Sequence, residues 1–188
     1  MREVNPTYIE IYDDVLTVTE CKLLIDWFEA SPHVEGKVIT EGRSMVDPSR
    51  KKSKEVTSTF SGNRQISQII YSPIGYALEE YKKTYPSMDE YLSFWNLDDE
   101  YTFKKYETEE DGFKRWHCEQ CKGGEGRMLV WMLYLNDAQS GTAFMNYPTV
   151  DAKMGRCLIW PASWTHIHRS ELPNKGLKYI MSGWFSFK

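Results

Sequence analysis

Three of the four histidines of this chain lie in its second half, where they could build a metal centre. His117 and Glu119 are separated by one residue, and in an extended segment residues i and i+2 point the same way. An imidazole and a carboxylate side by side supply two ligands of a facial triad, which leaves coordination positions open for reactants. The third ligand must be a histidine from a distant strand, and His166 and His168 can both supply it.

The same residues allow other interpretations. A His-x-Glu pair taken alone is also typical of a solvated pair or a structural salt bridge. Cys118 and Cys121 have the spacing of zinc ligands, and the downstream histidines could complete a closed site, although His-x-His is tighter than the usual gap. The His-x-Glu of zinc deaminases needs a following Pro-Cys-x-x-Cys, and only Cys157 lies downstream. A jelly-roll binding domain without catalysis is a further alternative.

The elements that position these residues differ between the two halves of the chain. The first half predicts a short strand at 8–16 and a helix over 18–30, which begins at a capping box formed by Thr17 and Glu20. A second helical stretch begins near Arg64, is interrupted by Pro73 and Gly75, and stops at Pro86. The polar segment 41–54 has no period, so it is expected to be a solvated loop or a mobile flap over a site.

The second half reads as short aromatic or apolar runs separated by turn residues. These runs are Tyr101–Thr108, Arg127–Asn136, Thr142–Tyr147, Gly155–Trp160 and Lys178–Phe187. Many short strands predict a sandwich, jelly roll or small barrel, and the 14% aromatic content favours a sheet-rich fold. We expect one mainly-β domain with N-terminal helices over residues 1–188, with helical support at about 17–86 and the β core at about 93–188.

The composition of the chain limits the classes of partner and the cellular location that we expect. The net charge of −4 argues against nucleic acid and anionic lipid as partners. The polar start of the chain does not resemble a signal peptide, and no apolar run nears the length of a membrane span. Four scattered cysteines do not make a disulfide framework. These features predict a soluble, cytoplasmic protein with reduced thiols and no membrane partner.

The order of the segments around the histidines is similar to that of a known family. After His117 come Arg127–Asn136, Ser140–Phe144, Gly155–Pro161, the histidine pair and Lys178–Trp184. This order resembles the 2-oxoglutarate- and Fe(II)-dependent dioxygenases, specifically the prolyl 4-hydroxylase-like branch. The resemblance is strongest from Tyr106 to Trp184, with a looser match over Ile9–Phe28. It implies a double-stranded β-helix core of the jelly-roll or cupin kind.

The resemblance also implies roles for single residues. His117 and Glu119 match the His-x-acid pair that binds iron, although the family's usual acid is Asp. Tyr134 and Tyr106 match residues that hydrogen-bond 2-oxoglutarate, and Lys178 matches the basic residue that pairs with its distal carboxylate. A dianion in an aromatic-lined pocket requires such a fixed cation.

A further departure from the family precedes the metal histidine. Phe113 and Lys114 stand where relatives carry a small residue followed by Tyr.

Two registers are open for the distal histidine and its basic partner, since His166 with Lys175 and His168 with Lys178 both have spacings that occur in the family. Lys175 lies in Pro173–Gly176, a sequence typical of a surface turn. Lys178 begins the last aromatic strand and shares a face with the alternate positions that follow it. We therefore predict that His168 binds iron and that His166 orients a ligand or lines the cleft.

The function that the resemblance implies is hydroxylation of an unactivated C–H bond, with Fe(II), 2-oxoglutarate and O2 as requirements and ascorbate as a supporting reductant. The branch favours a peptidyl proline, whereas small relatives also modify other protein side chains, nucleobases or small molecules. The alternative function is a zinc- or metal-stabilised jelly-roll binding module without catalysis. Succinate release distinguishes the two, because a binding module produces none.

Overall fold

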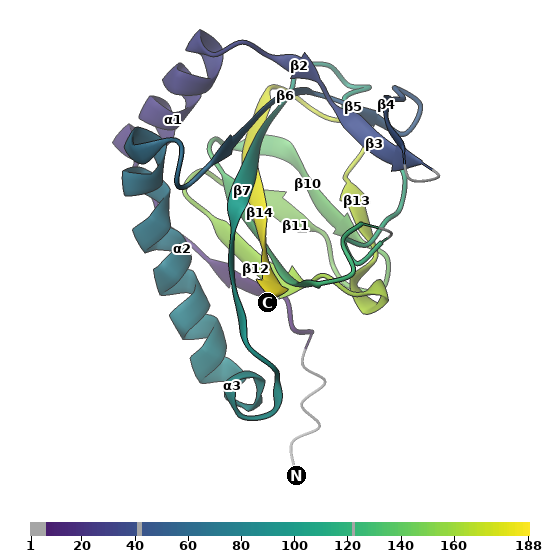
Figure 1. Cartoon of the computed structure of the whole chain (residues 1–188). Helices are drawn as coiled ribbons and strands as arrows, with labels where there is room; N and C mark the ends of the chain where they lie inside the picture. Colours follow the sequence, from purple (N-terminus) through teal and green to yellow (C-terminus); the bar gives the residue numbers. More distant parts are fainter. Residues whose placement is uncertain (1–6, 41–42, 122) are drawn as a thin grey trace.

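The computed structural model describes residues 7–40, 43–121 and 123–188, and its centre is a large antiparallel sheet (Figure 1). Within these residues the sheet contains, in spatial order, β1 (Glu10–Tyr12), β12 (Cys157–Pro161), β9 (Arg127–Tyr134), β14 (Lys178–Phe187), β7 (Trp95–Tyr106), β6 (Lys54–Thr59) and β2 (Val34–Glu35). A smaller sheet packs against its inner face and contains β11 (Val150–Ala152), β10 (Ala138–Phe144) and β13 (His168–Ser170). Two facing antiparallel sheets are the expected jelly-roll architecture, so the predicted fold class is confirmed.

Two further strand pairs lie at one end of this core. They are the hairpin of β3 (Lys37–Thr40) with β4 (Arg43–Val46), and the pair of β5 (Lys51–Lys52) with β8 (Gly112–Phe113). The predicted loop or flap at 41–54 therefore contains the short strands β4 and β5 with a turn between them, and residues 41 and 42 lie outside the described part. Lys51 is buried rather than solvated because its ammonium pairs with the Glu55 carboxylate at 2.7 Å.

Helix α1 (Val18–Ala30) has the predicted bounds and covers the outer face of the large sheet (Figure 1). Its capping box is present, since the Thr17 hydroxyl accepts from the Glu20 N–H and the Glu20 carboxylate accepts from the Thr17 N–H. Leu24 and Phe28 project from the buried side of the helix into the core that it shares with the sheet.

The second helix is continuous, so the predicted interruption was wrong. Helix α2 (Arg64–Thr84) contains Pro73 and is followed by the short α3 (Ser87–Tyr91). Its buried face runs through the proline without a break and consists of Ile66, Ile70, Ile74, Ala77 and Tyr81. Packing of this apolar stripe against the sheet outweighs the local cost of the proline, which removes one helical hydrogen bond.

Strand β9 shows how the sheet separates two cores. Leu129, Trp131 and Leu133 pack with the helices, whereas the alternate residues Val130, Met132 and Tyr134 point between the sheets. Because both faces are covered, the strand is apolar from Met128 to Leu133, which is why it is readily predicted from sequence.

The predicted strand at 127–136 is confirmed but ends two residues earlier, at Tyr134, and the strand at 178–187 has the predicted bounds. The strand predicted at 101–108 begins earlier, at Trp95, and the three-residue strand β11 was not predicted. Strands β2 and β6, which lie between α1 and α2 in sequence, also join the large sheet.

None of the helices in the described part of the chain combines the length and the apolar character that crossing a membrane requires.

Candidate active site

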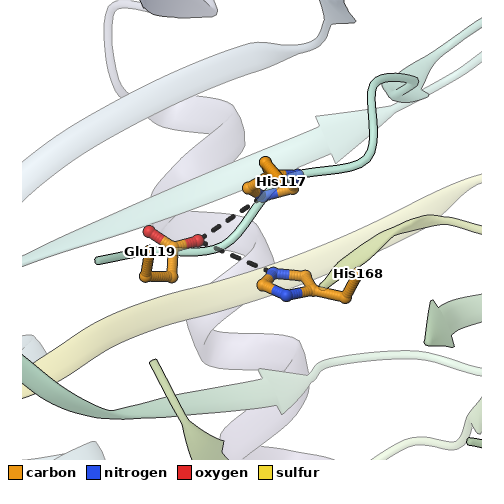
Figure 2. A group of neighbouring side chains, drawn as sticks. All are labelled: His117, Glu119 and His168. Atoms are coloured by element: carbon orange, nitrogen blue, oxygen red, sulfur yellow. Dashed lines mark ion pairs between the residues drawn. The ribbon is translucent and has the colours of Figure 1, made fainter. Parts of the chain in front are cut away.

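The side chains of His117, Glu119 and His168 point toward one another (Figure 2). Their nearest ligand atoms all lie within 4.8 Å of one another. Oε1 of Glu119 is 3.5 Å from Nε2 of His117 and 3.6 Å from Nε2 of His168. Two imidazole nitrogens and one carboxylate oxygen around a common centre are the donor set of a facial triad, and this set fits one Fe(II) ion.

Backbone hydrogen bonds hold the three residues in place. The N–H of His117 donates to the carbonyl of His168, and the N–H of His168 donates back to the carbonyl of His117, at 3.0 and 2.9 Å. The N–H of Glu119 donates to the carbonyl of Ala162 at 3.0 Å. Residues 117–119 therefore form an isolated bridge and a bend rather than the end of a strand, yet the two ligands still share one side.

The other ring nitrogens set the orientation of both imidazoles. Nδ1 of His117 lies 3.0 Å from the carbonyl oxygen of Arg115, and Nδ1 of His168 lies 2.9 Å from that of His166. A carbonyl can only accept, so Nδ1 carries the hydrogen in each ring and Nε2 presents its lone pair to the centre.

The charge states also suit metal binding. Burial and the neighbouring His168 lower the pKa of His117. Although burial alone would raise it, interactions with His117 and His168 hold the pKa of the Glu119 carboxyl well below its usual range. The site therefore offers a neutral imidazole and an ionised carboxylate at neutral pH.

The second carboxylate oxygen of Glu119 has its own partners. Oε2 accepts hydrogen bonds from Nη1 of Arg127 and from Nε1 of Trp184, each at 3.1 Å. These contacts leave Oε1 directed at the histidines.

A cavity of about 660 Å³ between the two sheets contains this group. Lys178, Tyr134 and Tyr106 line it, so the structure brings all the predicted site residues to one cavity. Lys178 is 2% exposed, and its ammonium donates to the Ser140 hydroxyl and to the carbonyls of Ser140 and Gly141.

No carboxylate in the described part of the chain lies within ion-pair distance of Lys178, and burial lowers its pKa to about 8. A buried ammonium without a counter-ion fits an anionic ligand such as a 2-oxoglutarate carboxylate. Tyr106 lies beneath it, with its ring centre 5.2 Å from Nζ, and the Tyr134 hydroxyl is 2.6 Å from that of Thr142.

The structure places the two candidates for the distal metal ligand, His166 and His168, in different surroundings. His166 lies in a 3-10 turn (Trp164–His166) and stacks on Tyr147 outside the cavity lining. Its Nε2 is 2.7 Å from the carbonyl oxygen of Thr7, and its Nδ1 is 2.8 Å from the Thr165 hydroxyl. This histidine fastens the start of the described chain to the core and does not line the cleft, contrary to one of the expectations.

The cysteines are not part of the ligand group. Cys118 and Cys121 line the cavity as free thiols but lie outside the cluster of three ligand atoms. Trp164, two residues before His166, is 74% exposed and does not line the cavity either.

Two lining residues that were not predicted from the sequence are Lys104 and Arg127. Lys104 had a usable signal, because it lies two positions before Tyr106 and so shares its face of β7.

Comparisons with known proteins agree with this geometry. Residues 101–186 match the sequence profile of the 2OG-Fe(II) oxygenase superfamily. A comparison with curated proteins found no match.

Similar solved structures cover nearly the whole chain at low identity. A viral collagen prolyl hydroxylase from Paramecium Bursaria Chlorella virus-1, in complex with 2OG, has a TM-score of 0.68 and 16% identity, over 96% of this chain and 97% of that one. A prolyl-4-hydroxylase from Pseudomonas putida has a TM-score of 0.68 and 14% identity, over 96% and 93% of the two chains. A prolyl hydroxylase from Trichoplax adhaerens, in complex with a hypoxia inducible factor peptide fragment, has a TM-score of 0.72 and 14% identity, over 98% and 86%.

Residues 101–186 thus match the 2OG-Fe(II) oxygenase superfamily, and the fold and the His-Glu-His group agree with that match. The segment 101–186 belongs to that superfamily, and the chain is an enzyme that uses Fe(II) and 2-oxoglutarate.

Proposed function

We propose that this oxygenase holds iron through His117, Glu119 and His168, binds the distal carboxylate of 2-oxoglutarate at Lys178, and hydroxylates a peptidyl proline. One observation carries the proposal. The three ligand atoms within 4.8 Å of one another share a cavity with a buried ammonium that has no described carboxylate partner. That combination matches a divalent cation and a dianion bound side by side.

Bound Fe(II), 2-oxoglutarate and O2 supply oxidative decarboxylation to succinate and carbon dioxide together with oxidation of a C–H bond. The chain supplies position and charge for this chemistry. Lys178 neutralises the distal carboxylate, and Tyr134 and Tyr106 provide hydroxyls in the same part of the cavity. Burial raises the pKa of both tyrosines, so these hydroxyls remain protonated donors at neutral pH.

The proline assignment is supported by the shared fold of three prolyl hydroxylases over nearly the whole chain. The cavity volume of about 660 Å³ leaves space for a residue of a bound peptide beside the cosubstrate. Aromatic rings of Trp116, Trp160 and Trp184 line it and suit the apolar face of a pyrrolidine ring.

The test proceeds in steps that can fail separately. Anaerobic titration with Fe(II) and a competing chelator should give one ion per chain, and 2-oxoglutarate should then bind with a visible charge-transfer band. With O2, ascorbate and proline-containing peptides, succinate should form together with a peptide heavier by one oxygen atom. Stoichiometric zinc binding without succinate would support the metal-stabilised binding module instead.

A further inference from the structure

The active-site cavity is strongly basic in a protein that is acidic as a whole. Eight Lys and Arg side chains line it, against the two acidic residues Glu55 and Glu119, while the chain carries a net charge of −4. Binding of Fe(II) and dianionic 2-oxoglutarate adds charges that cancel each other. The excess of positive charge therefore remains when the substrate enters.

Several of these cations already have partners. Lys51 pairs with Glu55 at 2.7 Å, and Arg127 pairs with Glu119 at 3.1 Å. Lys178 is assigned to the cosubstrate. Of the remaining lining cations, Lys104 and Arg169 are the two that are partly buried and make no ion pair with any carboxylate in the described part of the chain.

Lys104 projects from the large sheet into the cavity. Its ammonium donates to the hydroxyl of Ser182, and burial together with the nearby Lys51 lowers its pKa to about 8. The adjacent Lys105 points to the opposite face, where it contacts Glu29 at 2.7 Å and Glu107 at 2.9 Å. Lys105, which points outward, thus forms two ion pairs, whereas Lys104, which points into the cavity, has no carboxylate partner among the described residues.

Arg169 reaches the cavity from the smaller sheet, next to the metal-ligand candidate His168. Its guanidinium lies on the ring of Trp116, with Cζ 4.4 Å from the ring centre. Its Nε is buried without a hydrogen-bond partner among the described residues. A guanidinium held over an aromatic ring with an unused donor is suited to an incoming oxyanion.

We propose that the substrate carries a carboxylate or phosphate close to the carbon that is hydroxylated, and that Lys104 and Arg169 bind this negative charge. The inference rests on the proposed function, because it takes the cavity as the active site. In a peptide substrate the charge comes from an acidic residue next to the proline. In a small-molecule substrate it is part of the same molecule as the reacting carbon.

Paired ligands that differ only in charge test this directly. The anaerobic Fe(II)/2-oxoglutarate enzyme is titrated with the blocked peptides Glu-Pro-Glu and Gln-Pro-Gln, and separately with free glutamate and glutamine. We expect the acidic member of at least one pair to bind about tenfold or more tightly, with the preference reduced by salt. The pair that shows the preference identifies the source of the charge.

Variants then test which side chains bind the negative charge of the ligand. Lys104→Met and Arg169→Met should each reduce the acidic preference by about fivefold or more while leaving 2-oxoglutarate affinity within about twofold of wild type. Lys22→Met removes an exposed lysine of α1 and is the control, expected to change neither quantity. Thermal unfolding and circular dichroism verify that each variant is folded.

Each outcome is informative. If neither acidic ligand is preferred, or if no member of either pair binds, the inference is overturned although iron and 2-oxoglutarate still bind. If Lys104→Met mainly weakens 2-oxoglutarate, that lysine belongs to the cosubstrate and its assignment to the substrate is wrong. If the wild-type chain binds neither iron nor 2-oxoglutarate, the proposed function itself fails.

Discussion

Arg127 and Trp184 stack on each other and donate hydrogen bonds to the same oxygen. Cζ of Arg127 lies 3.5 Å from the centre of the Trp184 ring, and both side chains reach Oε2 of Glu119 at 3.1 Å. A glutamate is longer and has more rotamers than the family's usual aspartate. The stacked pair removes that freedom and leaves Oε1 directed at the metal position.

Arg127→Met should therefore weaken Fe(II) binding by about 10–100-fold, because contacts that orient a metal ligand contribute on this scale. Competition with a chelator under anaerobic conditions measures the change. Trp184→Phe should give a similar loss, and the double variant should lose less than the product of the two effects, because both side chains act on Oε2 of Glu119. Lys153→Met, which breaks an ion pair with Asp13 outside the cavity, is the control. Unchanged affinity in Arg127→Met would show that Glu119 needs no support.

The two distal histidines should behave differently. His168→Ala should abolish iron binding and succinate production. His166→Ala should keep iron stoichiometry but lower the unfolding free energy by about 1–2 kcal/mol, because it removes a buried hydrogen bond to the Thr7 carbonyl. Metal analysis and denaturant unfolding separate the two effects. Turnover by His168→Ala together with loss of iron in His166→Ala would reverse the assignment.

Lys178→Met should weaken 2-oxoglutarate binding by more than about a hundredfold, since breaking a buried charge pair costs roughly 3–5 kcal/mol. Fe(II) affinity should change little. Lys175→Met is the matched control, because Lys175 is exposed in the turn before β14. Isothermal titration of both variants decides which lysine binds the cosubstrate, and equal losses in both would refute the choice of Lys178.

The same substitution should stabilise the protein in the absence of 2-oxoglutarate. The pKa of Lys178 falls from its ordinary value of 10.5 to about 8 on folding, so the unfolded chain binds more protons between these values. Wild-type stability attributable to this residue is lowest below pH 8 and rises toward pH 10.5. Lys178→Met should therefore exceed wild type by about 3 kcal/mol at pH 7, with the difference shrinking across that window. Urea unfolding at several pH values measures it, and a difference independent of pH would contradict the explanation.

Cys118→Ser and Cys121→Ser should retain iron binding and succinate production. Neither thiol belongs to the ligand group, and Cys121 is exposed. Elemental analysis of the purified variants checks for metal, with wild type prepared in parallel. Release of stoichiometric zinc with loss of folding in both variants would instead support a structural zinc site.

Local patterns predicted much of this fold. The capping box marked the start of α1, and buried apolar runs marked the central strands. The predicted interruption at Pro73 was wrong because helix propensity describes only the local sequence. The buried apolar stripe of α2 is stabilised by packing against the sheet beneath it.

Residues of the candidate site could be predicted where the alternation of side chains along a single segment is enough to place them. His117 and Glu119 share a side, and Lys178 begins the strand whose inner face lines the cavity. Alternation requires Lys104 and Lys105 to point in opposite directions, and the expected place of Tyr106 in the site is what indicates that Lys104 is the one inside. Contacts between neighbouring strands that are distant in sequence, such as Arg127 with Trp184, depend on pairing that no short motif contains.

The reciprocal backbone bonds between His117 and His168 also bear on how the metal exchanges. These bonds close the loop between residues 117 and 168. The conformational entropy that the chain loses on closing this loop is compensated by the packing of the folded sheets rather than by a bound ion. A zinc finger, in contrast, loses its fold when its ion is removed. Because neither these backbone bonds nor the sheets involve a metal ligand atom, we expect removal of the ion to leave the fold intact. The protein should therefore pass through repeated cycles of iron removal and reloading without unfolding, in contrast to a zinc finger.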